Sequence, residues 1–278
     1  NLMQRRASIP ARINIIGEHT DYLGGLALPF ASKQRLTLTA TSAESIQGDE
    51  TIVALWQAAG GWPAHLAVES SIPIGAGLSS SAALCLAVVL CSQGDIELMQ
   101  ACKEAQRIEH EVLGTPCGLL DQIAMMHAVE GHATFINFST MAVSPFLIPE
   151  DWCFKLVDSK VRRTLASTPF GASKEKPALS QHADGENQRV LEALKADPYS
   201  LGRLLNASHA SLKSIGVSHP KVDRLVDELQ STPGVLGARM MGGGFGGMIL
   251  VLVEHEGVLP ETEVVEASKG GFLEELFE

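Results

Sequence analysis

Ionisable side chains crowd one short segment near the start of the chain. The segment ARINIIGEHTDYLGG spans residues 11–25, and its polar groups include Arg12, Glu18, His19, Asp21 and Tyr22. An arginine beside two carboxylates and a histidine suits a ligand rich in hydroxyl groups, such as a sugar, because each hydroxyl both donates and accepts hydrogen bonds. The plainer alternative is a polar loop between two strands. The residues by themselves leave both interpretations open.

A second segment places glycines and serines in front of an apolar run. In IPIGAGLSSSAAL (72–84), Gly75 and Gly77 allow unusual backbone angles and close approach, and three serines follow them. The run LCLAVVL behind them is typical of a buried helix. A glycine loop at a helix N-terminus binds anions, because unpaired N–H groups and the helix dipole point at the ligand. The segment therefore predicts a phosphate-binding loop that lacks the Gly-Lys-Ser/Thr of a Walker A motif. An ordinary serine-capped helix is the alternative.

The third segment, MMGGGFGGMILVLV (240–253), concentrates five glycines between apolar stretches. Gly242, Gly244 and Gly247 match the spacing of a dinucleotide-binding loop, but a strand follows them where that motif requires a helix. Glycines between two strands let a ligand or another backbone come very close. A flexible loop is the alternative.

Hydrophobic periodicity predicts the elements that position these segments. The expected strands are 34–41, 64–70, 132–138, 153–159, 235–240 and 248–253. The expected helices run from the serine loop to near Gly94, and then over 95–114, 118–128, 186–196, 200–214 and 219–231. Asp95 is the expected N-cap and Gly114 the C-terminal stop of the second helix, and Asp121 lies near the start of the third. Strands and helices do not alternate strictly, which favours an α+β architecture over a doubly wound sheet.

Composition and charge exclude several functional classes. The length of 278 residues suggests two domains, and a formal net charge of −11 argues against nucleic-acid binding, which needs a basic surface. Five cysteines without a CxxC pair indicate a reduced, cytosolic compartment. No apolar run reaches the ~18 residues of a membrane span, and no secretory signal opens the sequence.

Two hydrolase motifs are incomplete. HEVLG (110–114) lacks the second histidine of a zincin, and GLSSS does not match the G-x-S-x-G motif of a serine hydrolase.

Taken in order, the three segments resemble the three motifs of the GHMP small-molecule kinases. The first, within RINIIGEHTDYLGGLALPFA, narrows the resemblance to the galactokinase family. Further stretches that look like that family are EHEVLGTPCGLLDQ (109–122), VDSKVRRTLAST (157–168) and LLNASHASLK (204–213). The resemblance covers most of the chain, although galactokinases are generally longer.

The resemblance implies a two-domain α+β fold with the site between the domains. Residues 1–149 would form an N-terminal domain like part of a ribosomal protein, and residues 150–278 a ferredoxin-like C-terminal domain. It also implies ATP and Mg²⁺ as cofactors and phosphorylation of the anomeric hydroxyl of galactose. The expected partners are the sugar and ATP, with no nucleic acid and no membrane, for a cytoplasmic monomer. A kinase for a different sugar and a non-catalytic sensor of sugar and ATP are the alternatives.

The family resemblance further implies roles for single residues. Arg12 and Asp121 correspond to the catalytic pair. The residues that correspond to sugar contacts are Glu18, His19, Asp21 and Gly118. Arg12 would stabilise the transferring phosphoryl group and favour the ionised form of Asp121. Two roles stay open for Asp121, which are a base that takes the hydroxyl proton late and a charge that only orients the hydroxyl.

Phosphate and metal contacts follow from the same resemblance. Ser81 and Glu109 correspond to ligands of the Mg²⁺ ion. The loop that would cradle the phosphates contributes Gly75, Gly77, Leu78, Ser79, Ser80 and Ser81. The glycines from Gly243 to Gly247 would pack beside the sugar and phosphate groups. Trp56 is a candidate for contacting adenine.

One position departs from the family pattern. Phe170 stands where galactokinases usually have a tyrosine that reaches a sugar hydroxyl, so it is the expected lining residue at that place. The loss of one neutral hydrogen bond is worth about 0.5–1.5 kcal/mol, roughly a tenfold effect at most. The substitution weakens the assignment of galactose without excluding it.

Overall fold

The first layer of the molecule is a four-stranded antiparallel sheet. In the computed structural model, which describes residues 2–73, 80–162, 176–242 and 247–277, this sheet has the order β11-β1-β3-β4. Its strands are β1 (Met3–Asn14), β3 (Pro29–Ser42), β4 (Ala64–Ser70) and β11 (Phe272–Phe277). The register of β1 on β3 shifts between Pro10 and Arg12, an irregularity of the kind that re-aims side chains near active sites.

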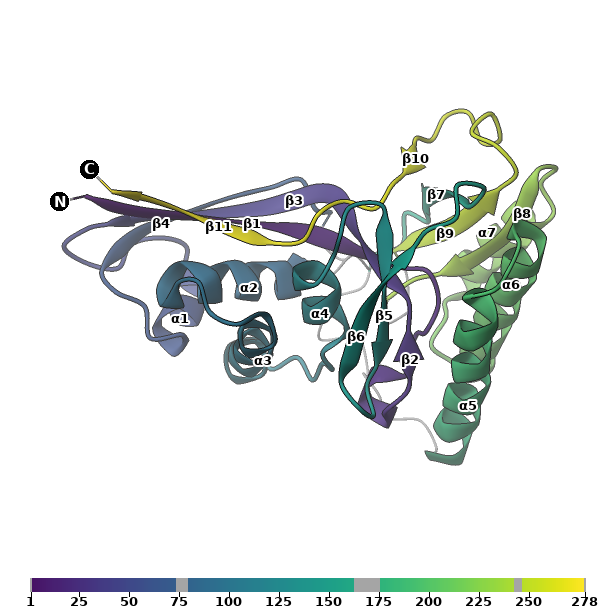
Figure 1. The fold of residues 1–278 in the computed structure, drawn as a ribbon, viewed down its shortest axis with the longest axis horizontal. Coiled ribbons are helices and arrows are strands. Elements are labelled where there is room, and N and C mark those ends of the chain that lie inside the picture. Colours follow the sequence, from purple (N-terminus) through teal and green to yellow (C-terminus); the bar gives the residue numbers. More distant parts are fainter. Residues whose placement is uncertain (1, 74–79, 163–175, 243–246, 278) are drawn as a thin grey trace.

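Four helices cover one face of this sheet (Figure 1). They are α1 (Glu50–Ala58), α2 (Ser80–Gln93), α3 (Leu98–Ile108) and α4 (Leu120–Met126). Helix α2 lies between the sheet and α3, so nearly all of its apolar run is buried. No single helix in the described ranges is long and apolar enough to cross a membrane; α2 together with 98–113 meets that length and composition only as a pair bent by 116°.

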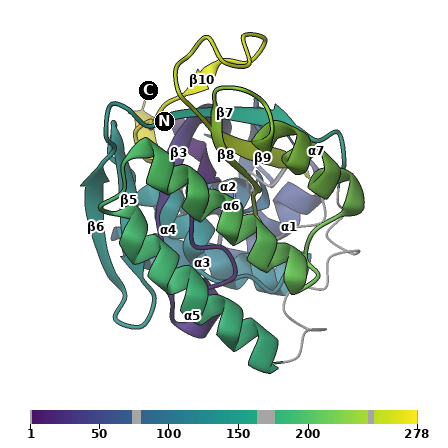
Figure 2. The same cartoon turned by 90° about the vertical axis from the view of Figure 1, so that its right-hand side faces the viewer.

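A second antiparallel sheet, of order β10-β7-β9-β8, lies at the other end of the molecule. Its strands are β7 (Cys153–Asp158), β8 (Val235–Met240), β9 (Met248–Val253) and β10 (Val264–Val265). Helices α6 (Pro198–Ser214) and α7 (Pro220–Gln230) pack on this sheet, as Figure 2 shows. Helix α5 (Lys176–Ala193) packs beside α6 and also reaches β2 of the third sheet.

The third sheet is small and contains β2 (Leu26–Ala27), β5 (His132–Asn137) and β6 (Ala142–Leu147). It stands between the other two, and the main apolar core runs from the first sheet through to Trp152, Phe154 and Leu205 of the second half. A smaller core lies between α6, α7 and the second sheet.

The predicted elements are largely confirmed. All six expected strands are present, with β8 and β9 at the expected residues, and the antiparallel sheets confirm the α+β architecture. The N-cap of α3 was predicted wrongly. Glu97, not Asp95, accepts the N–H groups of Met99 and Gln100.

The second helix ends at Gly114 as predicted, but its last turn is not α-helical. The α-helix stops at Ile108 and continues as a π-helical turn, η2 (Glu109–Leu113), before Gly114 ends it with a φ of 66°. Such turns occur frequently at functional sites because they re-aim one side chain. Here the turn carries Glu109, the predicted metal ligand.

Several elements were not predicted from the sequence, namely α1, β1, β2, β6, β10 and β11. Helix α5 also begins ten residues before the expected 186. The acidic tail FLEELF (272–277) forms β11, which pairs with β1 and brings both ends of the chain side by side (Figure 1). The domain boundary between residues 149 and 150 stays a prediction.

Candidate active site

Arg12 and Asp121 form a partly buried ion pair between the first sheet and α4. Arg12 extends from β1 and contacts Asp121 Oδ1 through Nε at 2.8 Å and through Nη2 at 2.7 Å. The arginine is 2% exposed, whereas the Asp121 side chain keeps 25% of its surface accessible. Burial opposes the charge, but Asp121 and Glu18 together hold the pKa of Arg12 above its usual value. The pair that the family resemblance implied therefore meets in the fold.

Asp21 and Gly118 lie against each other beside this pair. A Cβ atom added to Gly118 would stand 2.0 Å from Asp21 Oδ2, so only glycine leaves room for the carboxylate there. The other oxygen of Asp21 accepts the N–H of Tyr22 at 3.1 Å. Burial, and then the charge of Asp121, raise the pKa of Asp21 to about 6. The site thus holds two neighbouring carboxylates, Asp21 and Asp121, and one guanidinium.

His19 and Glu18 face in different directions. His19 has a φ of 55°, and its Nδ1 lies 2.9 Å from the hydroxyl of Tyr22. Glu18 is 3% exposed, and its Oε1 accepts from Arg239 Nη2 at 3.1 Å and from the N–H of Gly242 at 3.2 Å. Glu18 therefore joins the first segment to the start of the third. Its role as a sugar contact stays a prediction.

Ser81 and Glu109 meet at the N-terminal end of α2. Ser81 Oγ donates to Glu109 Oε2 at 3.3 Å, while Glu109 Oε1 is buried and has no hydrogen-bond partner among the described residues. Burial, and then the charge of Asp121, raise the pKa of Glu109 to about 7. A bound cation would compensate the buried carboxylate and use its unpaired oxygen, because Mg²⁺ prefers oxygen ligands.

The described ranges contain no cluster of three or more histidine, cysteine or acidic side chains that could hold a metal. Mg²⁺ is usually bound by one or two protein oxygens, with phosphates and water as its other ligands. Ser81 and Glu109 are therefore compatible with such an ion.

Other predicted contacts fall outside the described residues. These are Gly75, Gly77, Leu78, Ser79 and Phe170, together with residues 243–246. Of the predicted phosphate loop, Ser80 and Ser81 are described, and they open α2.

The candidate adenine contact was wrong. Trp56 is 0% exposed, its Nε1 donates to the carbonyl oxygen of Trp62 at 2.7 Å, and the two indole rings pack edge to face. A ring enclosed in this way has no free face for a nucleotide base. Trp56 is a residue of the core.

The sequence analysis missed the residues that bind backbone atoms in and next to the first segment (11–25). Arg239 of β8 and three residues of α5, His182, Glu186 and Asn187, all contact backbone atoms between Asn14 and Leu26. A polar residue in a predicted helix usually faces solvent, so the sequence of α5 did not indicate that these three residues make such contacts. Arg239 gave a weak signal, because a lone charge inside an apolar strand needs a buried partner.

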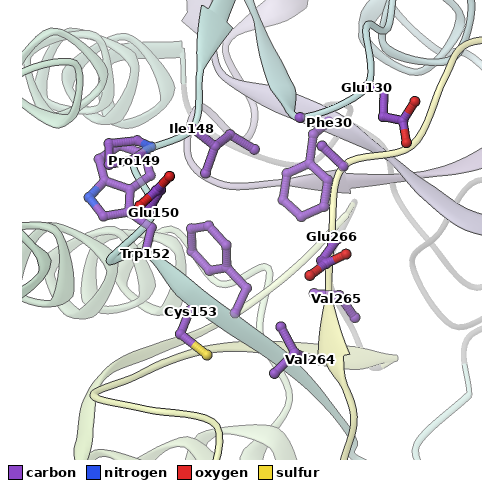
Figure 3. Close-up of a pocket in the computed structure, with 13 residues that line it drawn as sticks. Phe30, Glu130, Ile148, Pro149, Glu150, Trp152, Cys153, Val264, Val265 and Glu266 are labelled. Atoms are coloured by element: carbon purple, nitrogen blue, oxygen red, sulfur yellow. The ribbon is translucent and has the colours of Figure 1, made fainter.

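A cavity of about 380 Å³ lies elsewhere, between the β6–β7 connection and β10 (Figure 3). Its aromatic walls are Phe30, Trp152 and Phe154, which are themselves almost fully buried, and exposed glutamates stand at its rim. None of the predicted site residues lines it. The candidate site is therefore the cluster around Arg12 and Asp121.

Family models match the chain in three places. The model described as "GHMP kinases N terminal domain" matches residues 48–128, and "GHMP kinases C terminal" matches residues 190–261. The "Galactokinase galactose-binding signature" matches residues 5–42, which include β1 and the first segment.

Relatives and solved structures agree with these matches. The galactokinase of Thermotoga maritima is 33% identical over 89% of each chain, and that of Mycobacterium tuberculosis is 32% identical over 88% of this chain and 87% of its own. The crystal structure of Lactococcus lactis galactokinase complexed with galactose superposes with a TM-score of 0.83 at 25% identity, covering 97% of this chain and 95% of that one.

A Methanococcus jannaschii mevalonate kinase shares the fold, with a TM-score of 0.73 at 18% identity over 95% of this chain and 98% of its own. These likenesses confirm the fold class that the motifs predicted.

Proposed function

The chain belongs to the galactokinase family of GHMP kinases, and on that premise we propose that it transfers the γ-phosphoryl group of ATP to the anomeric hydroxyl of galactose. The observation that carries the proposal is the Arg12–Asp121 pair, in which Arg12, inside the segment that matches the galactose-binding signature, contacts an aspartate 109 positions later in the chain. Phosphoryl transfer depends mainly on positioning and on charge stabilisation, and a carboxylate with an arginine supplies both.

In this proposal Asp121 receives the sugar hydroxyl. The carboxylate is held by Arg12 at one oxygen and remains partly accessible, so it can accept a hydrogen bond from the attacking hydroxyl. The hydroxyl oxygen forms its bond to the γ-phosphorus as the bond to the leaving ADP oxygen breaks, and Asp121 takes the hydroxyl proton late in the step. Arg12 stabilises the negative charge on the transferring oxygens.

Asp21, with His19 and Gly118, belongs to the proposed sugar site. Asp21 is a hydrogen-bond acceptor when ionised, and the absent Cβ of Gly118 lets it lie beside the Asp121 pair. Tyr22 contacts His19 Nδ1 and so orients the imidazole ring. Phe170 is the proposed lining residue at the position where the family resemblance implies a tyrosine.

The phosphates of ATP are assigned to the loop from Gly75 to Ser81 and to the N-terminus of α2, where helix N–H groups favour anions. Ser81 and Glu109 would hold the Mg²⁺ ion. When bound, the ion neutralises charge that develops on the phosphates. The expectations of a monomer and of a cytoplasmic location stay predictions.

The proposal is tested by product analysis. The protein is incubated with MgATP and a panel of sugars, namely galactose and its C2, C4 and C6 analogues, and the products are identified by NMR. We expect galactose 1-phosphate with the highest kcat/KM. Phosphorylation of a different sugar, or binding of galactose and ATP without turnover, would overturn it.

A further inference from the structure

A buried carboxylate from the second half of the chain caps the turn that precedes the proposed sugar contacts. Glu186 of α5 is 0% exposed. Its Oε2 accepts the backbone N–H of Gly17 at 3.3 Å, the N–H of Glu18 at 3.1 Å and the hydroxyl of Ser208 at 2.7 Å. Its Oε1 accepts from Arg189 Nε at 2.7 Å. The two N–H groups of the turn thus share one carboxylate oxygen.

A histidine one helical turn away holds the same turn at its carbonyl. His182 is also buried, and its Nε2 donates to the carbonyl oxygen of Glu18 at 2.9 Å. The other ring nitrogen, Nδ1, accepts from the hydroxyl of Ser211 of α6 at 2.7 Å. Both sides of the Glu18 backbone are therefore bound by α5, through His182 and Glu186.

The surrounding charges keep this carboxylate ionised. Burial disfavours the charge on Glu186, but Arg189 and Arg239 outweigh it and hold its pKa below the usual value. Arg239 completes the enclosure, because it donates to the carbonyl oxygens of Asn14 and Ile15 and to the side chain of Glu18. Both oxygens of Glu186 and both ring nitrogens of His182 have hydrogen-bond partners, whereas the neighbouring Arg189 Nη2 is buried and has none among the described residues. Buried polar groups whose partners are all present define one geometry.

The held turn leads directly into His19 and Asp21. Gly17 has a φ of 107°, and a Cβ there would lie 2.5 Å from the Leu26 carbonyl oxygen, so the turn is tightly packed on its other side as well. We infer that Glu186 and His182 are positioning residues that fix the 17–19 turn and thereby aim His19 and Asp21 at the sugar. This inference rests on the proposed function, because it assumes that those two residues contact the sugar.

The direct test is Glu186→Gln. Glutamine keeps the size of the side chain but replaces one accepting oxygen with an amide NH₂ group, which only donates, so it cannot accept from both Arg189 and the turn. We expect the KM for galactose to rise about tenfold, with the KM for MgATP and the kcat per active molecule within about threefold of wild type. A purely structural role would lower the active fraction and leave both KM values unchanged, and that result would overturn the inference.

Ser208→Ala is the matched control, since it removes a donor to the same carboxylate oxygen without touching the turn. We expect a lower Tm and a galactose KM within about twofold of wild type. If Glu186→Gln does not fold, His182→Asn removes the bond to the Glu18 carbonyl, and a galactose KM raised about threefold is expected. An unchanged KM in His182→Asn would then overturn the inference.

The galactose KM of a second variant, Asp21→Asn, distinguishes failure of the proposed sugar site from failure of the positioning role. Asp21→Asn alters the sugar contact itself, so an unchanged galactose KM in that variant contradicts the proposed sugar site. A raised KM in Asp21→Asn with an unchanged KM in Glu186→Gln contradicts the positioning role alone.

Discussion

Two nitrogens of Arg12, Nε and Nη2, converge on the same oxygen of Asp121 at 2.8 and 2.7 Å. The arginine belongs to β1 and the aspartate to the first turn of α4, so the contact ties the first sheet to the helices that cover it. It also leaves part of the Asp121 carboxylate accessible next to Asp21 and Glu109, whose pKa values are raised first by burial and then by the charge of Asp121.

Asp121→Asn should keep the fold and galactose binding but lose phosphoryl transfer. The change is nearly isosteric and removes the charge that accepts the hydroxyl proton. We expect kcat to fall by about 100-fold or more, in the range typical of a lost acid–base group. Steady-state kinetics and calorimetric titration with galactose measure the two effects.

The control for this variant is Asp151→Asn, which changes an exposed aspartate outside the site. Turnover by Asp121→Asn within a few-fold of wild type would contradict the assignment of Asp121.

Ser81→Ala and Glu109→Gln should both raise the Mg²⁺ concentration needed for half-maximal activity. The serine variant removes one neutral ligand, so we expect roughly a tenfold increase, and the glutamine variant removes a charge and should have a larger effect. Activity is measured against free Mg²⁺ at saturating ATP.

Glu111→Gln provides the matched control, because Glu111 lies on the same π-helical turn but pairs with Arg107 at the surface. If the Ser81→Ala curve coincides with that of wild type, Ser81 is only part of the start of α2.

Stability of the ligand-free protein should fall as the pH rises through neutrality, in part because of Glu109. Its pKa is raised from 4.5 to about 7, so between these values the folded state holds a proton that the unfolded chain has released. The favourable contribution is complete below about pH 4.5 and is lost as the pH passes about 7, with a size of about 3 kcal/mol. Asp21, with a pKa raised to about 6, acts in the same direction.

The measurement is urea unfolding between about pH 5 and pH 8 in EDTA, for wild type and Glu109→Gln. Because glutamine does not titrate, the difference in unfolding free energy between the two proteins should change with pH. A difference that stays constant over this range would show that Glu109 has an ordinary pKa.

Gly118→Ala should impair the proposed sugar site without altering the Asp121 side chain. The new methyl group would meet Asp21 Oδ2 at 2.0 Å, so Asp21 must move. We expect kcat/KM for galactose to fall by about tenfold or more, because a small displacement of a binding group lowers the rate by at least this factor. The KM for MgATP should change little.

Gly257→Ala is a suitable comparison, since its new Cβ would meet only the ring of His255 at 3.0 Å in an exposed loop. Equal kinetics in the two alanine variants would mean that Asp21 does not contact the sugar.

Phe170→Tyr should raise kcat/KM for galactose by roughly two- to tenfold, from one neutral hydrogen bond of about 0.5–1.5 kcal/mol. If the pocket is shaped for a sugar with an apolar group there, the buried hydroxyl instead costs about 1–3 kcal/mol with the true substrate. Steady-state kinetics on galactose and its C2, C4 and C6 analogues show whether kcat/KM rises or falls in the variant. Identical kinetics on every sugar would show that residue 170 does not line the pocket.

The elements whose hydrophobic pattern is local and strong could be predicted from the residues alone. Strands β8 and β9 were located to the residue, and α2 was found from its apolar run, because alternation and helical spacing are set within a few neighbours. Three glycine-bearing segments and their order also sufficed to predict the family. These signals are short in range and need no knowledge of what packs against them.

Tertiary structure decided the features that depend on distant partners. The mostly exposed strand β11 is paired with the edge of β1. The residues of the acidic tail have no local pattern that predicts this pairing. The π-helical turn at Glu109 likewise departs from a helix that local spacing predicts to be regular.

The Arg12–Asp121 pair and the residue that holds the 17–19 turn also differ in how far they could be predicted from the sequence. Arg12 and Asp121 could be predicted as a pair from family motifs, but their convergence on one oxygen came from the fold. Glu186 begins the helix predicted over 186–196, where a charged residue ordinarily faces solvent, yet it is buried against the 17–19 turn. Whether a charge lies in water or in the interior depends on the surface that covers it, and that surface is supplied by residues far away in the chain.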